Sequence, residues 1–239
     1  MVLDFLSDIE LYFSLYVTGS TISVVGEECH HIMKVMRHTA GDKLYVTNGN
    51  GKIFETEITS TAKNEVKAKI VKTFEYKNRL TNFTICLPRL RVADRFEFAL
   101  EKCVELGFTN FVVFESERTV AKGDKSDRWK KIGMAAMKQS LQSYLPKFTY
   151  FKKFEQLNQL EGKKIIFDQN SDFIFSENIQ KLSADEKYNL IFGPEGGFSN
   201  EEIELLYDKI TYRLTPNRLR AETAVIAAAA MVSLLSADY

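Results

Sequence analysis

The amino-acid sequence predicts an α/β protein in which a small β-rich domain precedes a parallel sheet wrapped by helices. From Leu44 to Val71 the chain consists of short alternating runs around Asn-Gly, a pattern typical of β-hairpins. After the segment YKNRLTN (76–82), apolar strands alternate with helical periods, which is typical of a parallel sheet. We therefore predict a β-rich domain or barrel at residues 1–77 and a second domain at residues 78–239.

In the β-rich half, strands are predicted at LYVT from 44, IFETEI from 53 and VKAKIV from 66, with NGNG (48–51) as the first turn. Before them, EECHHIMKVMRHTAGDKL (27–44) opens this half with an amphipathic pattern. It predicts a helix with a cationic strip of His31, Lys34 and Arg37 opposite a core face of Ile32, Val35 and Met36. The strip is either a solvated face or a contact for RNA phosphates.

The second half is predicted to hold five strands, which contain TICL at 84, FVVF at 111, KKIIF at 163, YNLIF at 188 and YRL at 212. A helix at 92–106 is predicted from apolar residues at helical spacing: Val92, Phe96, Leu100, Cys103 and Val104. Gly107 is expected to end this helix in the left-handed conformation.

Composition limits the classes of function. The 32 basic and 32 acidic residues cancel, so a nucleic-acid surface would have to be a local patch. Cys29, Cys86 and Cys103 are widely spaced and odd in number, which favours a reducing compartment over a disulfide framework or a zinc site. We see no signal peptide, and the longest apolar run, 224–235, is shorter than the roughly 20 residues of a membrane span. We expect a soluble, cytoplasmic protein.

A metal site is also not expected. His31 and His38 are seven residues apart and could share a helix face, but all three histidines lie in this one segment and no further ligand completes a site.

The segment IFGPEGGFSNEEIELL (191–206) runs from an apolar strand through three glycines into a helix. Ser199 and Glu202 are spaced as a capping box, and Phe198 and Ile203 as a hydrophobic staple. The segment is either an ordinary strand-to-helix turn or a ligand cradle at the carboxyl end of a parallel strand. It lacks the P-loop and dinucleotide patterns and carries Glu195 without a lysine, so a neutral or cationic cofactor group suits it better than phosphate.

The segment RLTPNRLRAETAVIAAAAMVSLL (213–235) is a second strand, stiff loop and helix. Its alanine-rich helix either forms part of an ordinary core or packs closely against the sheet or a second subunit. Arg218, Arg220 and Glu222 stand at the mouth of this helix, as solvated charges or as part of a site.

These segments, in this order, resemble the bacterial 16S ribosomal RNA uridine N3-methyltransferases of the SPOUT superfamily. The resemblance spans residues 27–235 and rests on HHIMKVMRHTAGD, FALEKCVELGF, SERTVAKGDKSDRWKKI, QSLQSYLP, IFGPEGGFSNEE and NRLRAETA. It implies a PUA-like N-terminal barrel, a C-terminal domain with a trefoil knot, S-adenosylmethionine as methyl donor, and a homodimer that acts on 16S ribosomal RNA of the small subunit.

The resemblance also implies functional residues by position. The cofactor would be bound by three loops: Asp168 and Gln169; Phe192, Gly193, Pro194, Glu195, Gly196 and Gly197; and Leu214, Thr215, Asn217, Arg218 and Leu219. Arg220 is the expected catalytic residue, which would stabilise negative charge on the uridine, with Glu222 ranked second as proton acceptor. RNA contacts are expected from His31, Lys34, Arg37, Arg89 and Arg91.

The chain departs from the family pattern at a few positions. Thr215 replaces a usual glycine, and Leu141 and Gln142 replace a usual Gly-Arg pair. The familiar arginine near the N-terminus is not visible in MVLDFLSDIELYF. Two alternatives stay open: a related methyltransferase that acts on another RNA such as tRNA, and an RNA-binding module without catalytic activity.

Overall fold

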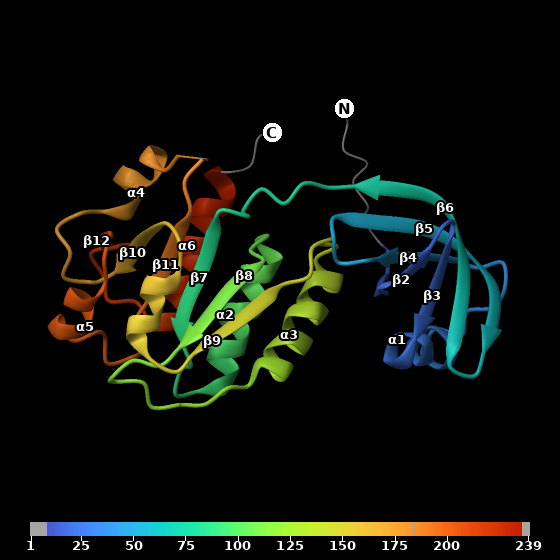
Figure 1. Ribbon diagram of the computed structural model, residues 1–239, viewed down its shortest axis with the longest axis horizontal. Coiled ribbons are helices and arrows are strands. Elements are labelled where there is room, and N and C mark those ends of the chain that lie inside the picture. Colours follow the sequence, from blue (N-terminus) through green and yellow to red (C-terminus); the bar gives the residue numbers. More distant parts are fainter. Residues whose placement is uncertain (1–8, 184, 236–239) are drawn as a thin grey trace. The chain divides into compact units, whose positions relative to one another are not determined.

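The computed structural model describes residues 9–183 and 185–235, and its helices and strands are drawn in Figure 1. The chain divides into two compact units. Unit 1 comprises Met1–Asn78 and Met137–Leu145, and unit 2 comprises Arg79–Ala136 and Pro146–Tyr239. Unit 1 holds a curled, mostly antiparallel sheet and unit 2 a parallel sheet with helices, so the predicted α/β class is confirmed.

The sheet of unit 1 has six strands in the order β1-β4-β5-β6-β3-β2. They are β1 (Leu11–Phe13), β2 (Tyr16–Thr18), β3 (Thr21–Val25), β4 (Lys43–Thr47), β5 (Lys52–Ala62) and β6 (Glu65–Glu75). β4 and β5 pair antiparallel across the Asn-Gly turn, as predicted, with Thr47 opposite Ile53. The β5–β6 register shifts at Glu55/Thr56 and Ile58/Ser60, and such bulges increase the twist that curls a sheet.

The turn NGNG has a second role, because the segment Ser143–Leu145 packs directly on it. The amide of Gly51 donates to the Ser143 carbonyl at 2.9 Å, and the Leu145 amide donates to the Gly49 carbonyl at 2.9 Å. Gly51 has a φ of +85°, and a Cβ there would lie 2.5 Å from the Tyr144 hydroxyl oxygen. Only glycine satisfies both the turn and this close approach.

The predicted helix of unit 1 forms in two parts, and one of its predicted faces is wrong. α1 (Gly26–His30) continues as a π-helical turn over His31–Val35. The wider turn changes the angle between successive side chains, so Ile32 is buried as predicted, whereas Val35 and Met36 are 56% and 46% exposed. Met33 packs against the core in their place.

The sheet of unit 2 has the order β12-β10-β11-β7-β8-β9, and every pair in it is parallel. Its strands are β7 (Phe83–Pro88), β8 (Asn110–Phe114), β9 (Lys147–Phe151), β10 (Lys163–Phe167), β11 (Tyr188–Phe192) and β12 (Lys209–Tyr212), which lie side by side in Figure 1. β11 is buried at all positions, as expected of a central strand covered on both faces. The strand predicted at YRL is shifted: β12 ends at Tyr212, and Arg213 and Leu214 begin the loop after it.

Helices and short helical turns connect these strands. They are α2 (Ala93–Glu105), α3 (Ser126–Gln139), α4 (Phe175–Asn178), α5 (Asn200–Leu205) and α6 (Ala221–Leu235), with 3₁₀ turns at Phe154–Gln159 and Ile179–Lys181. α2 buries Phe96, Leu100, Cys103 and Val104 as predicted, but Val92 precedes the helix as its N-cap and is 43% exposed. Gly107 has a φ of +97° and ends α2 as expected. α2 packs against α6.

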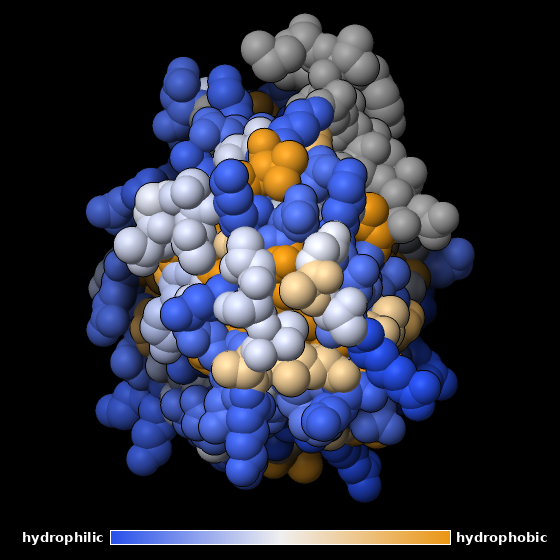
Figure 2. All heavy atoms as spheres, turned by 90° about the vertical axis from the view of Figure 1, so that its right-hand side faces the viewer, coloured by the Kyte–Doolittle hydropathy of each residue, from blue (hydrophilic) through white to orange (hydrophobic). Residues whose placement is uncertain are grey.

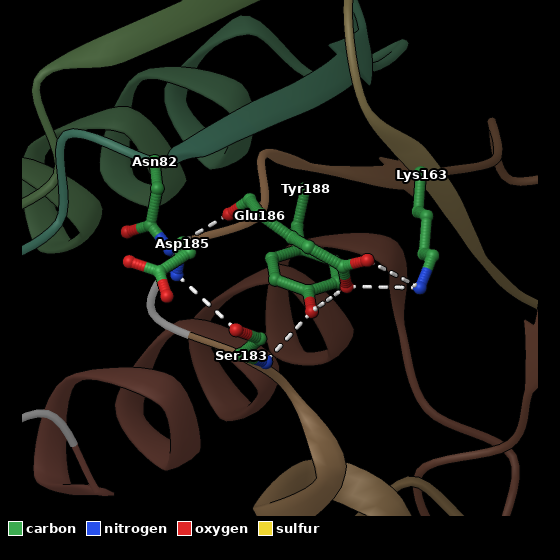
Figure 3. A network of polar contacts seen from close by, with 6 residues as sticks. All are labelled: Asn82, Lys163, Ser183, Asp185, Glu186 and Tyr188. Carbon is green, nitrogen blue, oxygen red and sulfur yellow. Dashed lines mark hydrogen bonds and ion pairs between the residues drawn. The ribbon is translucent and has the colours of Figure 1, made fainter.

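A polar network closes the amino ends of the central strands, as Figure 3 shows. The Tyr188 hydroxyl donates to Glu186 at 2.7 Å and accepts the Ser183 amide at 2.8 Å. Lys163 contacts both oxygens of Glu186, and this pairing raises the pKa of the lysine and lowers that of the glutamate. The side-chain amide of Asn82 donates to the Glu186 carbonyl at 3.1 Å. These contacts fix the end of the sheet that lies opposite the glycine loop.

Candidate cofactor and RNA site

The three loops expected to bind the cofactor all follow carboxyl ends of adjacent parallel strands. Asp168 and Gln169 follow β10, the segment Gly193–Gly197 follows β11, and Leu214–Leu219 lies after β12. In the sheet, β11 lies between β10 and β7. Along the chain, β7, β8 and β9 extend the sheet in one direction, and the chain then returns to form β10 on the opposite side of β11. The strand order thus reverses here, which is where open α/β sheets bind ligands.

The glycine loop turns sharply after β11, and its glycines serve two purposes. The Gly197 amide donates to the Pro194 carbonyl at 2.8 Å, and Gly197 has a φ of +70° with nothing within 4 Å of a Cβ placed there. A Cβ on Gly193 would lie 3.3 Å from the Phe198 ring, and one on Gly196 would lie 3.3 Å from Cδ of Arg118. Packing within the protein explains Gly193 and Gly196, whereas Gly197 faces open space.

The helix that follows the loop begins as the sequence predicts. Ser199 is the N-cap of α5, and its hydroxyl accepts the Glu202 amide at 3.2 Å while Glu202 accepts the Ser199 amide at 3.1 Å, which confirms the capping box. Phe198 and Ile203 both pack against the core cluster that contains Phe114 and Phe154. The exit of the loop is therefore fixed by hydrogen bonds and by apolar packing.

Two residues that were not predicted as site residues tie the glycine loop to the loop after β8. The Arg118 guanidinium donates to the Gly196 carbonyl at 2.8 Å and to the Phe198 carbonyl at 3.4 Å. The buried Glu202 carboxylate, 6% exposed, also accepts the Glu117 amide at 2.7 Å. Both contacts join residues that lie about 80 positions apart in the sequence. Arg118 stands in the SERTVAKGD segment that carries the family resemblance, but its partner could not be identified from the sequence.

The segment after β8 is itself held in place. The Glu115 carboxylate accepts the Gly123 amide at 2.8 Å and a hydrogen bond from the Tyr150 hydroxyl, and the Tyr150 bond is the main reason that the pKa of Glu115 is lowered. The Arg89 guanidinium donates to the carbonyls of Lys122 and Gly123. Arg89, expected to contact RNA phosphates, therefore pins this segment.

The other expected RNA contact of unit 2, Arg91, lies beside the glycine loop. Its amide donates to Glu195 at 2.8 Å, and its side chain is exposed. The bond links the loop after β7 to the loop after β11 and engages the one carboxylate of the glycine loop. Arg91 thus lies next to the glycine loop, with its backbone amide bound to Glu195.

The loops after β10 and β12 are joined through Gln169. Its side-chain amide donates to the carbonyls of Thr215 and Pro216 at 3.1 and 3.3 Å. The Thr215 hydroxyl accepts the Asn217 amide at 3.0 Å, and Thr215 is not among the residues with positive φ, so the usual glycine is not required there. Leu141, at the other position where the family usually has glycine, does adopt a φ of +56°.

The expected catalytic pair lies at the start of α6. The Arg220 carbonyl accepts the Ala224 amide at 2.9 Å, so its backbone is fixed by the helix while its side chain is exposed. Glu222, in the first turn, is largely buried and lies 3.5 Å from Nε of Arg95, which α2 supplies. Arg95 was not predicted. Because the Glu222 carboxylate already has this cationic partner, proton acceptance would require giving up that contact.

The remaining expected RNA contacts belong to unit 1. Lys34 and Arg37 are exposed, but Arg37 follows the π-helical turn with a φ of +59° and does not continue a helical strip with Lys34. His31 lies 3.2 Å from a Glu10 oxygen, and His38 lies 3.5 Å from Asp42. Figure 2 shows that the face of unit 1 on the right in Figure 1 is largely hydrophilic, with apolar side chains in small separate groups.

Two further findings concern the described residues only. In residues 9–183 and 185–235, no cluster of three or more His, Cys, Asp or Glu side chains is arranged to hold a metal ion. Over the same residues, no helix combines the length and the apolar character that crossing a membrane requires.

Comparison with known proteins identifies the family. The RNA methyltransferase domain family matches residues 77–233, and the RNA methyltransferase PUA domain family matches residues 26–71, which confirms the PUA-like prediction for the N-terminal half. The ribosomal RNA small subunit methyltransferase E of Bacillus subtilis is 30% identical over 241 residues, covering 94% of this chain and 94% of that protein.

Solved structures agree over nearly the whole chain. A predicted RNA methyltransferase from Thermotoga maritima is 30% identical with a TM-score of 0.72, covering 95% of this chain and 98% of that one. A putative methyltransferase from Legionella pneumophila, solved with the bound cofactor SAM, is 26% identical with a TM-score of 0.79, covering 95% and 96%. The chain therefore belongs to the RNA methyltransferase family that includes ribosomal RNA small subunit methyltransferase E.

Proposed function

We propose that this protein transfers a methyl group from S-adenosylmethionine to N3 of an unpaired uridine in 16S ribosomal RNA of the small ribosomal subunit. The observation that carries the proposal is the alignment, over 94% of the chain, with a ribosomal RNA small subunit methyltransferase E. The choice of uridine N3 rests on the motifs GPEGGFS and LRAET.

The loops at the carboxyl edge of the parallel sheet suit S-adenosylmethionine. Gly197 leaves open space where other residues would place a side chain, so a ligand can approach the backbone closely. Phe192 and Pro194 are buried, while Asp168, Leu214 and Leu219 are only partly exposed, so the edge offers both apolar and polar contacts. We assign Gln169 and Asn217 to the hydrogen bonds that hold the third loop in shape.

Bound S-adenosylmethionine supplies an electrophilic methyl group on a sulfonium. The protein would position uridine N3 in line with this group, and such positioning can contribute roughly 7–11 kcal/mol to lowering a barrier. N3 would lose its proton to solvent water, negative charge would spread to the neighbouring carbonyl oxygens, and methyl transfer would release S-adenosylhomocysteine. The exposed guanidinium of Arg220 would stabilise that charge, since its backbone is fixed at the start of α6. Glu222 would hold the site together through Arg95.

RNA binding would involve both units. A paired N3–H is buried in a duplex, so the target base must be unpaired or extruded. Lys34 and Arg37 of unit 1 and Arg91 and Arg218 of unit 2 are exposed and suited to phosphates.

We further propose a cytoplasmic homodimer with a trefoil knot in unit 2. α6 supports the dimer: Ile226, Ala227, Ala230 and Met231 are only partly buried, and Leu234 is 64% exposed. These side chains recur at helical spacing and form an apolar stripe that a second copy would cover. Sedimentation should give about twice the chain mass of 27.4 kDa, and a monomer at micromolar concentration that still methylates RNA would exclude the dimer.

The reaction is tested with purified protein, S-adenosylmethionine labelled on its methyl group, and small ribosomal subunits from a strain that lacks the corresponding enzyme. We expect label in N3-methyluridine of 16S RNA. Free 16S RNA, large subunits and tRNA are assayed in parallel. Label confined to tRNA would support the alternative RNA substrate, and absence of both methyl transfer and cofactor binding would support a non-catalytic RNA-binding module.

A further inference from the structure

Unit 2 contains a pocket between α2 and α3 to which the proposed methyl transfer assigns no role. It has a volume of about 200 Å³, and its charged lining consists of Arg89, Glu97, Lys125 and Arg128. These residues come from the loop after β7, from α2, from the residue before α3 and from the first turn of α3. We call it the α2–α3 pocket. Because sites for whole small molecules have roughly 300–1,000 Å³, it suits a single group of a larger ligand.

The lining of the α2–α3 pocket has an excess of positive charge. It holds three cations, Arg89, Lys125 and Arg128, and one carboxylate, Glu97. Glu97 accepts two hydrogen bonds from Arg128, one of them from Nη2 at 2.7 Å. Asp94 also attracts Arg128, but it lies outside the lining. The surplus of cations favours an anionic group as the ligand.

The cations are accessible to such a group. Lys125 is exposed, and no carboxylate pairs with it within the part of the chain that the structure describes. The side chain of Arg128 is 64% exposed. Arg89 is half-buried, and both of its hydrogen bonds to the carbonyls of Lys122 and Gly123 come from Nη1. Its Nε and Nη2 are therefore left for a second partner.

The inner wall of the pocket strengthens the attraction of an anion. Leu90, Phe96 and Trp129 line it and are each 2–3% exposed, and the Phe96 and Trp129 rings pack with centroids 5.8 Å apart. An apolar wall lowers the local dielectric constant and so strengthens charge interactions beside it. Ala93, the first residue of α2, also lines the pocket, and this helix has no side-chain cap. Its positive dipole end adds to the cations.

The segments that line the α2–α3 pocket also contact the proposed reaction site. Two residues after Arg89, the Arg91 amide donates to Glu195 of the glycine loop at 2.8 Å. Two residues after Ala93, Nε of Arg95 lies 3.5 Å from Glu222 in the first turn of α6. A phosphate held in the pocket would therefore belong to the RNA segment around the methylated base.

We propose that the α2–α3 pocket binds a backbone phosphate of the RNA substrate near the target uridine. Lys125, Arg128 and the free edge of Arg89 would contact the phosphate oxygens, as cations commonly do in RNA recognition. Glu97 would oppose binding and hold Arg128 in place. The inference rests on the proposed function, since it takes RNA as the substrate, and it adds Lys125 and Arg128 to the RNA contacts.

The first test compares Lys125→Ala with Lys131→Ala in the full-length chain. Lys131 is a matched control, because it is also exposed, lies on α3 and does not line the pocket. The probe is a fluorescein-labelled single-stranded dodecamer of uridines, and anisotropy gives its affinity over a series of salt concentrations. Thermal melting confirms that each variant is folded. Arg89 is not varied, because its bonds to Lys122 and Gly123 shape the loop after β8.

We expect Lys125→Ala to lose one phosphate contact. At about 0.1 M salt, such a loss should weaken binding to a single strand roughly fivefold and reduce the slope of log K against log salt by about 0.7. Lys131→Ala should change both quantities less. Equal affinities and equal salt slopes for the two variants would overturn the inference.

The second test has the opposite sign. Glu97→Gln removes the carboxylate of the lining, and with it a repulsion of the phosphate that amounts to up to roughly threefold in affinity at about 6 Å in water. We therefore expect this variant to bind the dodecamer more tightly than wild type. Weaker binding would overturn the inference, because Glu97 would then support RNA binding instead of opposing it.

Trp129 reports directly on occupancy, because it lines the pocket and is the only tryptophan of the chain. We expect the unlabelled dodecamer to change its fluorescence emission in wild type, and Lys125→Ala to need more RNA for the same change. Emission that does not respond to RNA would overturn the inference. A response to inorganic phosphate alone would also overturn it, since the pocket would then bind a free anion.

Failure of this inference can be distinguished from failure of the proposed function. The binding measurements need no cofactor, whereas methyl transfer to small ribosomal subunits tests the reaction itself. Methyl transfer without an effect of Lys125→Ala on RNA binding would overturn only the phosphate pocket. RNA binding that depends on Lys125, without methyl transfer, would overturn only the proposed reaction.

Discussion

Replacement of Glu202 by glutamine should loosen the connection between the glycine loop and the loop after β8. Both carboxylate oxygens accept backbone amides: the partly buried amide of Glu117 at 2.7 Å and the buried amide of Ser199 at 3.1 Å. In glutamine, one of these positions becomes an amino group that faces an N–H donor. One of the two amides then loses its partner, which costs ~1–3 kcal/mol.

Loss of the negative charge near the start of α5 contributes as well, so a control is needed. Glu201→Gln removes a charge from the same helical turn, but Glu201 is exposed. It should cost ~0.3–1 kcal/mol through the helix dipole alone. We therefore expect Glu202→Gln to lower the free energy of unfolding by ~1–3 kcal/mol more than Glu201→Gln.

The assay is denaturant unfolding at 25 °C followed by tryptophan fluorescence. Trp129 is the only tryptophan of the chain and is buried in unit 2, so its signal reports on the unit that contains the loop. Calorimetry on the same variants should show weaker S-adenosylmethionine binding for Glu202→Gln than for Glu201→Gln. If the two variants unfold at the same denaturant concentration with equal slopes, the hydrogen bonds of Glu202 do not hold the loop.

Three further predictions concern the site. Gly197→Val should weaken S-adenosylmethionine binding tenfold or more, about 1.4 kcal/mol, whereas Gly197→Ala, which bears less positive-φ strain and less bulk, should weaken it less; equal affinities on calorimetry would move the cofactor elsewhere. Arg220→Ala should lower the single-turnover methylation rate by roughly 10²- to 10³-fold at saturating RNA and cofactor, more than Glu222→Gln does; the reverse ranking would make Glu222 the essential base. The lowered pKa of Glu115 means that its stabilisation is complete above the ordinary value of 4.5 and is lost as the pH falls through the lowered value. Glu115→Gln should therefore reduce the loss of thermal stability between pH 6 and pH 3, and an unchanged pH dependence would show that its bonds are not coupled to folding.

Local patterns in the sequence predicted local structure well. The Asn-Gly hairpin, the Ser199–Glu202 capping box and the end of α2 at Gly107 each depend on residues close together in the chain, and the structure confirms all three. The strand order of the parallel sheet does not follow from such patterns. The strands β1–β3 and β9, each of only three or five residues, were not predicted.

The misses have physical causes. A π-helical turn at His31–Val35 changed the side-chain spacing, so a prediction based on the α-helical period put Val35 and Met36 in the core. The return of Ser143–Leu145 to unit 1 and the bonds of Arg118 and Glu202 join residues about 80 or more positions apart. No periodicity in one sequence contains that information. Arg95 was missed for the same reason, because its partner Glu222 lies on a helix near the other end of the chain.

The three expected cofactor loops lie at one edge of one sheet, and hydrogen bonds from Gln169, Arg91 and Arg118 connect them to neighbouring loops. This arrangement supports their assignment as a binding site.

The central claim, methylation of uridine N3 in 16S RNA, is tested most directly by mass spectrometry of ribosomal RNA nucleosides. The 16S RNA of a strain that lacks this gene is compared with that of its parent and of the strain complemented with wild type or Arg220→Ala. The account predicts that N3-methyluridine is lost in the deletion strain, returns with the wild-type gene, and is strongly reduced with Arg220→Ala. An unchanged N3-methyluridine content in the deletion strain would contradict the account.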